Sequence, residues 1–90
     1  MSEKKIALIT GANKGLGFET AHQLGRQNIK VLIGARDETR GREAAAKLLK
    51  EGLDAEFILL DVSDEKTYES AAKFIEETYG KLDILVNNAG

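Results

Sequence analysis

The amino-acid sequence predicts an α/β fold built on a parallel sheet. Four short apolar runs alternate with three longer segments whose apolar residues recur at helical spacing, and the connections between them are short. Strands that are joined through helices lie parallel to one another, with right-handed crossovers. The pattern therefore predicts the order β-α-β-α-β-α-β in a single domain, without internal repeats or linkers.

The first predicted strand, Ile6–Thr10, is a continuous apolar run, which is typical of a parallel strand covered on both faces. A glycine-rich turn, Thr-Gly-Ala-Asn-Lys-Gly-Leu-Gly, follows at residues 10–17, and a helical pattern extends from about Gly15 to Gln27. The side of this helix that we expect to be buried carries Leu16, Ala21 and Leu24.

Lys30–Ala35 is the second predicted strand, and residues 39–51 form the second helix. Asp37 or Thr39 is expected to cap this helix, because a short side-chain oxygen can accept a hydrogen bond from its free N–H groups. Gly52 suits the helix end. The face expected to pack on the sheet carries Ala45, Leu48 and Leu49.

The third predicted strand covers residues 55–60, and a helix capped by Ser63 or Asp64 follows it. Gly80 stops that helix, and the fourth predicted strand covers residues 82–87. The expected packing face of the third helix carries Tyr68, Ala71, Ala72, Ile75 and Tyr79.

The glycines of the first turn point to a ligand. Gly11 permits a sharp turn off the strand, Gly15 leaves room for a phosphate beside the backbone, and Gly17 lets the helix pack tightly. The N-terminus of that helix then faces an anion. We interpret the fold as a Rossmann-type doubly wound sheet with strand order 3-2-1-4, and the turn as a dinucleotide pyrophosphate site. The alternative is a tight strand–helix connection that binds nothing.

A doubly wound dinucleotide fold has two halves, and these 90 residues supply only the first. We therefore expect residues 1–90 to be the N-terminal part of a longer nucleotide-binding domain. The fourth strand, which contains Ile84, Leu85 and Val86, would then be an uncovered edge. Such an edge favours pairing with another chain, so a homo-oligomer formed through it is one expectation.

Composition and charge argue against several classes of function. The net charge is −2, which is not the basic footprint of a nucleic-acid-binding or anionic-membrane-binding protein. Cysteine is absent, and His22 has no second histidine with which to share a metal, so we expect no metal site. The first apolar run is too short for a signal peptide or a membrane span, which predicts a cytoplasmic protein.

Three segments together resemble the short-chain dehydrogenase/reductase family. The turn at residues 10–17 is similar to the family's cofactor turn, and Asp61-Val62 is similar to its adenine-contacting pair. The segment Asn-Asn-Ala-Gly at residues 87–90 resembles the one that follows the family's fourth strand. Residues 11–15 and 35–41 look most like the NADPH-dependent carbonyl reductase branch.

This resemblance implies the NADPH-dependent reduction of a small-molecule carbonyl to an alcohol, or the reverse, in the intact protein. The family's catalytic Ser, Tyr and Lys lie in its second half. Its Tyr-x-x-x-Lys pattern is absent here, because Ala72 follows Tyr68 at that spacing and Asp83 follows Tyr79. No residue of this chain inherits a catalytic role, so we expect the 90-residue chain itself to be inactive.

The end of the second strand bears on the choice between NAD and NADP. An acidic residue about twenty positions after the glycine turn would bind the ribose 2′-OH, but Ala35 and Arg36 stand there. A guanidinium can grip a 2′-phosphate bidentately, and Lys14 and Arg40 could add positive charge. The alternatives are that these are solvated surface charges, and that Asp37 turns inward so that NAD is tolerated.

The remaining candidates follow the two other motifs. Asp61 could accept a hydrogen bond from the adenine amino group or merely cap the third helix. By family resemblance, Thr10 ties the turn to the segment at residues 87–90, Asn13 orders the turn, and Asn88 approaches the cofactor ribose. The cofactor-binding residues expected for NADP(H) are Gly11, Asn13, Lys14, Gly15, Leu16, Gly17, Arg36, Arg40, Asp61, Val62, Asn88, Ala89 and Gly90.

Two other functions stay open at this point. The chain could be a module that binds a nucleotide without turning it over, or an assembling segment that binds no ligand and pairs through its fourth strand. A methyltransferase is less consistent with the sequence, because the acidic residue usual in its first turn is not present.

Overall fold

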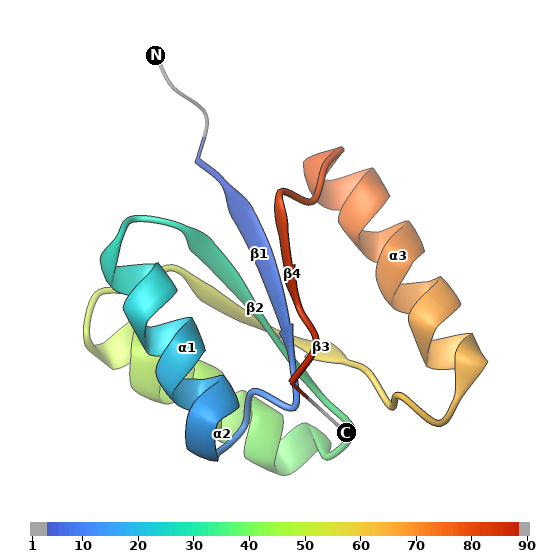
Figure 1. Ribbon diagram of the computed structural model, residues 1–90, viewed down its shortest axis with the longest axis horizontal. Coiled ribbons are helices and arrows are strands. Elements are labelled where there is room, and N and C mark those ends of the chain that lie inside the picture. The colour runs from blue at the N-terminus through green and yellow to red at the C-terminus, as the bar shows by residue number, and fades with distance from the viewer. Residues whose placement is uncertain (1–3, 89–90) are drawn as a thin grey trace.

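The computed structural model describes residues 4–88 and contains a four-stranded parallel sheet with the order β3-β2-β1-β4 (Figure 1). This confirms the predicted fold class and strand order. The strands are β1 (Ile6–Thr10), β2 (Lys30–Ala35), β3 (Ala55–Leu59) and β4 (Ile84–Val86). The helices are α1 (Gly15–Arg26), α2 (Glu38–Lys50) and α3 (Glu65–Tyr79).

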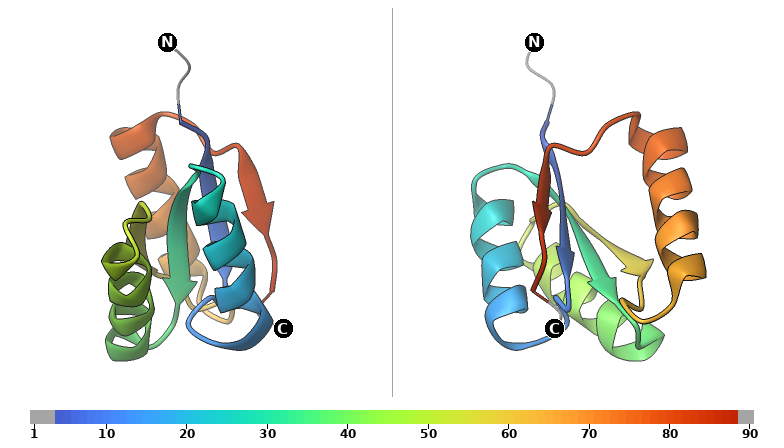
Figure 2. Two further views of the ribbon diagram at one scale, coloured as in Figure 1. Left: turned by 90° about the vertical axis from the view of Figure 1, so that its left-hand side faces the viewer. Right: turned by 45° about the vertical axis from the view of Figure 1, so that its right-hand side comes forward.

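The sheet is covered on both faces, with α1 and α2 on one side and α3 on the other (Figure 2). Successive strand residues point to opposite faces, so the residues of β1 and β2 that are covered on both faces are nearly all apolar; the polar exceptions are Lys30 at the start of β2 and Thr10 at the end of β1. The core under α1 and α2 includes Ala7, Ile9, Ala21, Val31, Ile33 and Leu48. The core under α3 includes Ile6, Leu8, Leu32, Ile58, Ala71 and Ile75.

The helix starts settle the alternative caps. Asp37 caps α2, where its side chain accepts a hydrogen bond from the N–H of Arg40 at 3.0 Å. Asp64, and not Ser63, caps α3 by accepting from the N–H of Lys66 at 3.0 Å. The predicted boundaries of these two helices therefore hold to within a residue or two.

Strand β4 is shorter than the predicted span of residues 82–87, by two residues at its start and one at its end. The Asp83 carboxylate accepts a hydrogen bond from the N–H of Ile6 at 2.8 Å, and the N–H of Asp83 donates to the carbonyl of Ile6 at 2.9 Å. The Ile6 N–H holds the pKa of Asp83 below its usual value. This side chain anchors β4 beside β1 before the strand ladder begins.

The helix faces were predicted only in part. Leu16 is 80% exposed, so its assignment to the buried side of α1 was wrong. The buried residues of α1 are Gly17, Ala21 and Gly25, which lie four residues apart on one face. This stripe of small residues brings the helix axis close to the sheet, and Leu16 lies beside the stripe. Leu24 is half-buried.

The other two helices show the same effect. In α2, Ala45 and Leu48 are buried as predicted, but Leu49 is 54% exposed. In α3, Ala71 and Ile75 are buried, whereas Tyr68 and Ala72 are exposed. The stripe of α3 that packs on the sheet is therefore narrow and consists of Ala71 and Ile75, with the partly buried Tyr79 beside them. None of the helices in residues 4–88 is long and apolar enough to cross a membrane; the cytoplasmic location stays a prediction.

The contrast between Leu48 and Leu49 yields a test of the packing. We expect Leu48→Ala to lower the free energy of unfolding by about 2–5 kcal/mol, because it leaves a cavity in the core. The adjacent Leu49→Ala makes the same chemical change at an exposed position and should cost about 0.5 kcal/mol or less. Urea denaturation of both variants measures the difference, and equal losses would contradict the assigned face of α2.

Candidate cofactor-binding site

The turn between β1 and α1 requires glycine at two positions. Gly11 and Gly15 have φ of 61° and 60°, in the left-handed region that side chains disfavour. Among the residues that the structure describes, no heavy atom lies within 4 Å of the point where a Cβ on Gly15 would be. The backbone at Gly15 therefore borders open space on its outer side.

The N-terminus of α1 differs from those of the other helices. Lys14 occupies its N-cap position in an extended conformation and makes no side-chain capping hydrogen bond within residues 4–88. Helices α2 and α3 each have an aspartate cap and a glutamate in the first turn, whereas the first turn of α1 has no acidic residue. The first N–H groups of α1 and its positive dipole end are thus left for an anion from outside the helix.

Gly17 holds the turn against the end of β4. A Cβ on Gly17 would lie 2.5 Å from both the side-chain nitrogen of Asn88 and the carbonyl oxygen of Gly11. That nitrogen donates to the same carbonyl at 3.2 Å. Gly17 therefore packs closely, as predicted, against the Asn88 side chain and the Gly11 carbonyl. The hydrogen bond between these two groups links the turn to the segment after β4.

Thr10 makes a second link between the same two segments. Its side chain is almost fully buried, and its hydroxyl oxygen accepts from the N–H of Asn88 at 2.9 Å. The hydroxyl also donates to the carbonyl of Val86 at 3.4 Å. This confirms the predicted tie between Thr10 and the segment at residues 87–90 as far as Asn88; Ala89 and Gly90 lie outside the described residues.

A hollow of about 510 Å³ lies at the carboxyl ends of the strands, beside the turn. Its volume is within the range of ligand sites, and its position is the switch point between β1 and β4 where open α/β sheets bind ligands. Eight of the predicted site residues come together around it. They are Gly11, Asn13, Lys14, Gly15, Arg36, Asp61, Val62 and Asn88.

The other candidates lie elsewhere. Leu16 is exposed and Gly17 is buried, and neither lines the hollow. Arg40 lines a neighbouring hollow of about 260 Å³, which shares Asn13 and Lys14 with the first. The two hollows therefore meet at the middle of the glycine-rich turn.

Asp61 lies on the wall of the main hollow, in a turn of its own. Its carboxylate accepts from the hydroxyl and the N–H of Ser63 at 2.7 and 2.9 Å. These hydrogen bonds, together with the nearby charge of Arg36, hold the pKa of Asp61 below its usual value. The alternative that Asp61 caps α3 is wrong, because Asp64 does so. At neutral pH, Asp61 thus presents an ionised acceptor.

The sequence interpretation missed three residues here. Leu60 and Ser63 also line the hollow, and Thr67 supports it from α3. The hydroxyl of Thr67 accepts from the N–H of Asp61 at 2.9 Å and lies 3.0 Å from its carbonyl oxygen. The pattern Asp-x-Ser, which is typical of an Asx turn, could have identified Ser63.

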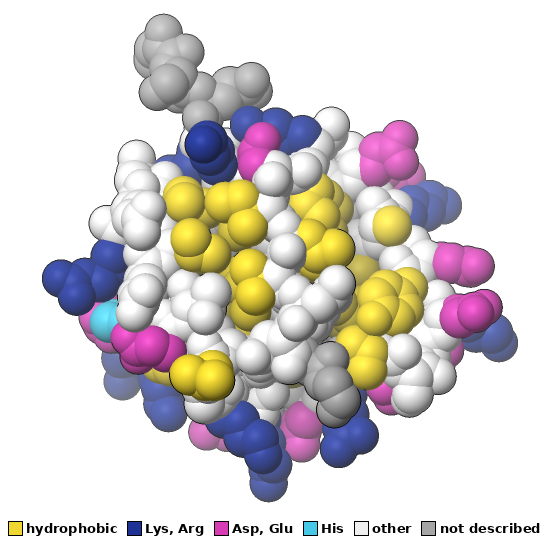
Figure 3. All heavy atoms as spheres, viewed as in Figure 1, with side chains coloured by type: hydrophobic (Ala, Val, Ile, Leu, Met, Phe, Trp, Pro, Cys, Tyr) yellow, Lys and Arg dark blue, Asp and Glu magenta, His cyan; other side chains and the backbone are white. Residues whose placement is uncertain are grey.

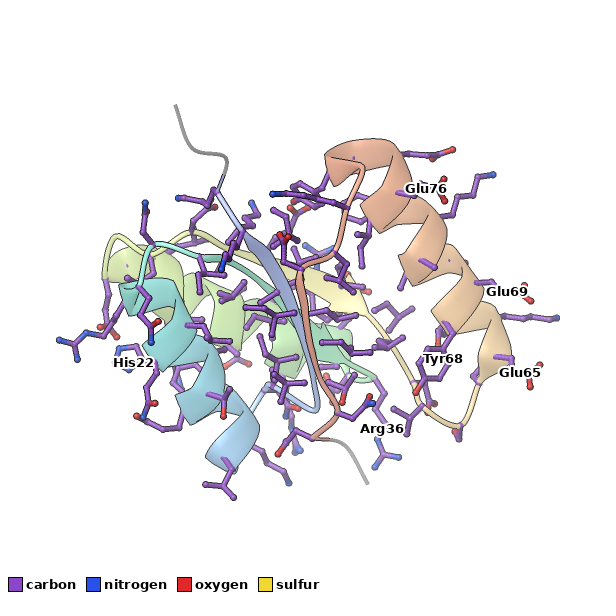
Figure 4. All side chains as sticks on the ribbon, turned by 45° about the horizontal axis from the view of Figure 1, so that its top comes forward. His22, Arg36, Glu65, Tyr68, Glu69 and Glu76 are labelled. Atoms are coloured by element: carbon purple, nitrogen blue, oxygen red, sulfur yellow. The ribbon has the colours of Figure 1, made fainter. Side chains whose placement is uncertain are left out.

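Arg36 and Asp37 follow β2 and point to different partners. Arg36 is exposed, and Figure 4 shows it extending outward at the end of the sheet that carries the hollow. The Asp37 carboxylate accepts from the N–H of Arg40 and lies 3.9 Å from its Nε. Asp37 therefore faces its own helix in this structure, which leaves Arg36 as the charged side chain from this connection on the wall of the main hollow.

His22 lies far from this site, on α1 (Figure 4). Its Nε2 is 2.8 Å from a carboxylate oxygen of Glu51, and its ring stacks on Phe18. Within residues 4–88, no group of three or more His, Asp or Glu side chains is arranged to hold a metal ion.

The sequence model of the short chain dehydrogenase family matches residues 5–90. The chain belongs to the short-chain dehydrogenase family. The resemblance found in the motifs is thereby confirmed, and with it the assignment to a family of oxidoreductases.

Named relatives agree with this assignment. Short-chain dehydrogenase/reductase 1 of Saponaria officinalis is 48% identical over 93 residues, covering 100% of this chain and 31% of that protein. Carbonyl reductase 1 (NADPH) of Rattus norvegicus is 43% identical over 99% of this chain and 32% of that protein. The structure of menthone neomenthol reductase from Mentha piperita is 45% identical with a TM-score of 0.93, over 99% of this chain and 32% of that one. The chain spans about a third of the length of these relatives.

The Thr10 tie can be tested by removing only its hydroxyl. We expect Thr10→Val to lower the free energy of unfolding by about 1 kcal/mol, because the N–H of Asn88 loses its acceptor. Hydrogen exchange of the Asn88 amide should accelerate more than that of β1 as a whole. Thr78→Val makes the same change at an exposed position of α3 and serves as the control. An unchanged exchange rate at Asn88 would contradict the role of Thr10.

Proposed function

We propose that this chain is the cofactor-binding part of an NADPH-dependent short-chain oxidoreductase that reduces a carbonyl to an alcohol, or catalyses the reverse. The observation that carries the proposal is the hollow beside the uncapped N-terminus of α1, with Arg36 on its wall. Membership of the family supports it, as does the similarity to carbonyl reductase 1 (NADPH) of Rattus norvegicus.

The residues around the hollow fit such a cofactor. The open backbone at Gly15 and the first N–H groups of α1 suit the diphosphate. Asp61, held ionised, suits the adenine amino group, and the backbone of Val62 would face the ring. When bound, the cofactor would supply the hydride; the residues of this chain bind and orient it.

The 2′-phosphate suits the connection after β2. Arg36 can offer two N–H groups to one phosphate, and Lys14 adds a point charge from the turn. Arg40 faces the neighbouring hollow, from which it adds positive charge. Asp37 is engaged as the cap of α2, so it does not compete for the 2′ position.

Neither tyrosine of this chain is placed as a proton donor to the site. Tyr68 lies on the side of α3 opposite Glu65 and Glu69 (Figure 4), is 41% exposed and does not line the hollow. The hydroxyl of Tyr79 donates to the Glu56 carboxylate, and neither residue lines the hollow. We therefore propose that the proton donor and the carbonyl pocket belong to the rest of the protein, and that residues 1–90 alone are inactive.

Arg36 offers the sharpest test of the cofactor. In the protein that carries this chain, we expect Arg36→Ala to raise the Kd for NADPH about 10- to 100-fold, because a charge-assisted contact to the 2′-phosphate is lost. The Kd for NADH should change little. Arg26→Ala, at the opposite end of α1, is the control and should leave both values unchanged. Titration calorimetry measures all of them; a preference of the wild type for NADH would overturn the proposal.

The free edge of β4 supports a second proposal, that the 90-residue chain on its own self-associates. Strand β4 pairs with β1, and no other strand within residues 4–88 pairs with it. Leu85 is 54% exposed, and hydrophobic side chains gather in the middle of the face along which β4 runs (Figure 3). We expect light scattering to show dimers that Leu85→Lys dissociates. A monomer at every concentration would contradict this proposal.

A further inference from the structure

At Gly41, α2 packs directly against the sheet, with no room for a side chain. Gly41 is buried in the first half of the helix, beside the ends of β2 and β3. A Cβ on Gly41 would collide with the Phe57 ring atoms Cδ1 and Cε1 and would lie 3.2 Å from the Cβ of Ala35. Glycine lowers helix stability relative to alanine, so this position is occupied at some cost to α2.

The atoms that face Gly41 differ in how far they can move, because the Phe57 ring is half-buried beside an open hollow of about 330 Å³ whereas Ala35 is buried. The Cβ of Ala35 belongs to the last residue of β2 and moves only with the backbone. Phe57 is held in β3, and the guanidinium of Arg42 lies 5.3 Å from the centre of its ring. The Nε of Arg42 is itself 2.8 Å from a Glu38 carboxylate oxygen. A larger residue at position 41 would therefore lift α2 from the sheet unless the Phe57 ring and the end of β2 both yield.

Lifting α2 would move the residues that face the cofactor end. Only Arg36 and Asp37 separate the end of β2 at Ala35 from the start of α2. The N–H of Gly41 donates to the Asp37 carbonyl at 2.9 Å, and the N–H of Arg40 donates to the Asp37 side chain. The height of α2 above the sheet thus sets where Arg36 and Arg40 stand relative to the hollow, and Asp37 moves with α2 as its cap.

We propose that Gly41 is a positioning residue that sets the preference for NADPH over NADH. It acts without touching the cofactor, by letting α2 settle on Ala35 and Phe57 so that Arg36 and Arg40 face a 2′-phosphate while Asp37 is withheld. This inference rests on the proposed function, since it presupposes that the hollow binds a dinucleotide.

The experiment compares the ratio of the Kd for NADH to the Kd for NADPH in the full-length protein. We expect Gly41→Ala to lower this ratio about tenfold, mainly through weaker NADPH binding. Phe57→Trp enlarges the ring from the other side of the contact and should have the same effect with Gly41 intact. Adding Phe57→Ala to Gly41→Ala removes the colliding ring atoms and should restore much of the ratio.

Gly25→Ala is the matched control. It also fills a buried helical glycine, whose Cβ would meet Leu53 at 3.2 Å, but it does so at the end of α1 remote from the hollow. The ratio of the Kd for NADH to the Kd for NADPH in Gly25→Ala should equal that of the wild type. Equal weakening of both cofactors in Gly41→Ala, or an unchanged ratio in both Gly41→Ala and Phe57→Trp, overturns the inference alone. A wild type that binds neither cofactor overturns the proposed function instead.

Discussion

The absence of a Cβ at Gly15 and at Gly17, in the first turn of α1, is the constraint on which the rest of the site depends. Gly15 and Gly17 are two residues apart, yet they have opposite consequences. At Gly15 the missing Cβ leaves open space on the outer side of the backbone. At Gly17 the missing Cβ lets α1 lie directly against the Asn88 side chain and the Gly11 carbonyl, which are hydrogen-bonded to each other. One glycine exposes the backbone, and the other fixes where that exposed backbone stands.

The three helix starts show how the chain distributes its unsatisfied N–H groups. Asp37 and Asp64 satisfy those of α2 and α3 from within the chain. At α1 the corresponding groups lack a side-chain cap in the described residues, which lowers the stability of the apo state relative to a capped helix. An anion bound there would replace the missing cap. Binding and folding stability are therefore linked at this helix, and a ligand specific to the native state stabilises it.

Periodicity in the sequence predicted the strands and helices that residues 4–88 form. The strand order was also predicted, because strands that alternate with helices have few possible topologies. The buried helix faces were predicted less well. Leu16 and Leu49 are apolar and at plausible spacing, but the stripes of small residues Gly17, Ala21 and Gly25, or Gly41 and Ala44, approach the sheet more closely. A pattern of hydrophobicity alone does not reveal which stripe permits the closest packing. The site was also predicted only in part. The glycine-rich turn revealed its position, but Ser63 and Thr67 belong to it only through their hydrogen bonds to Asp61 after β3, which the sequence pattern did not show.

Asp37 illustrates why the identity of the residues after β2 does not by itself establish which of the two cofactors, NADH or NADPH, is preferred. An acidic side chain in this connection could serve a ribose hydroxyl, and its proximity to Arg36 in sequence left that choice open. In the structure, the Asp37 carboxylate caps the first turn of α2, where it accepts a hydrogen bond from the N–H of Arg40. In the proposed site, one side chain would therefore couple helix capping to the choice of cofactor. If Gly41 sets how closely α2 lies on the end of β2, as we propose, the discrimination between the two cofactors would depend on a packing contact that neither cofactor touches.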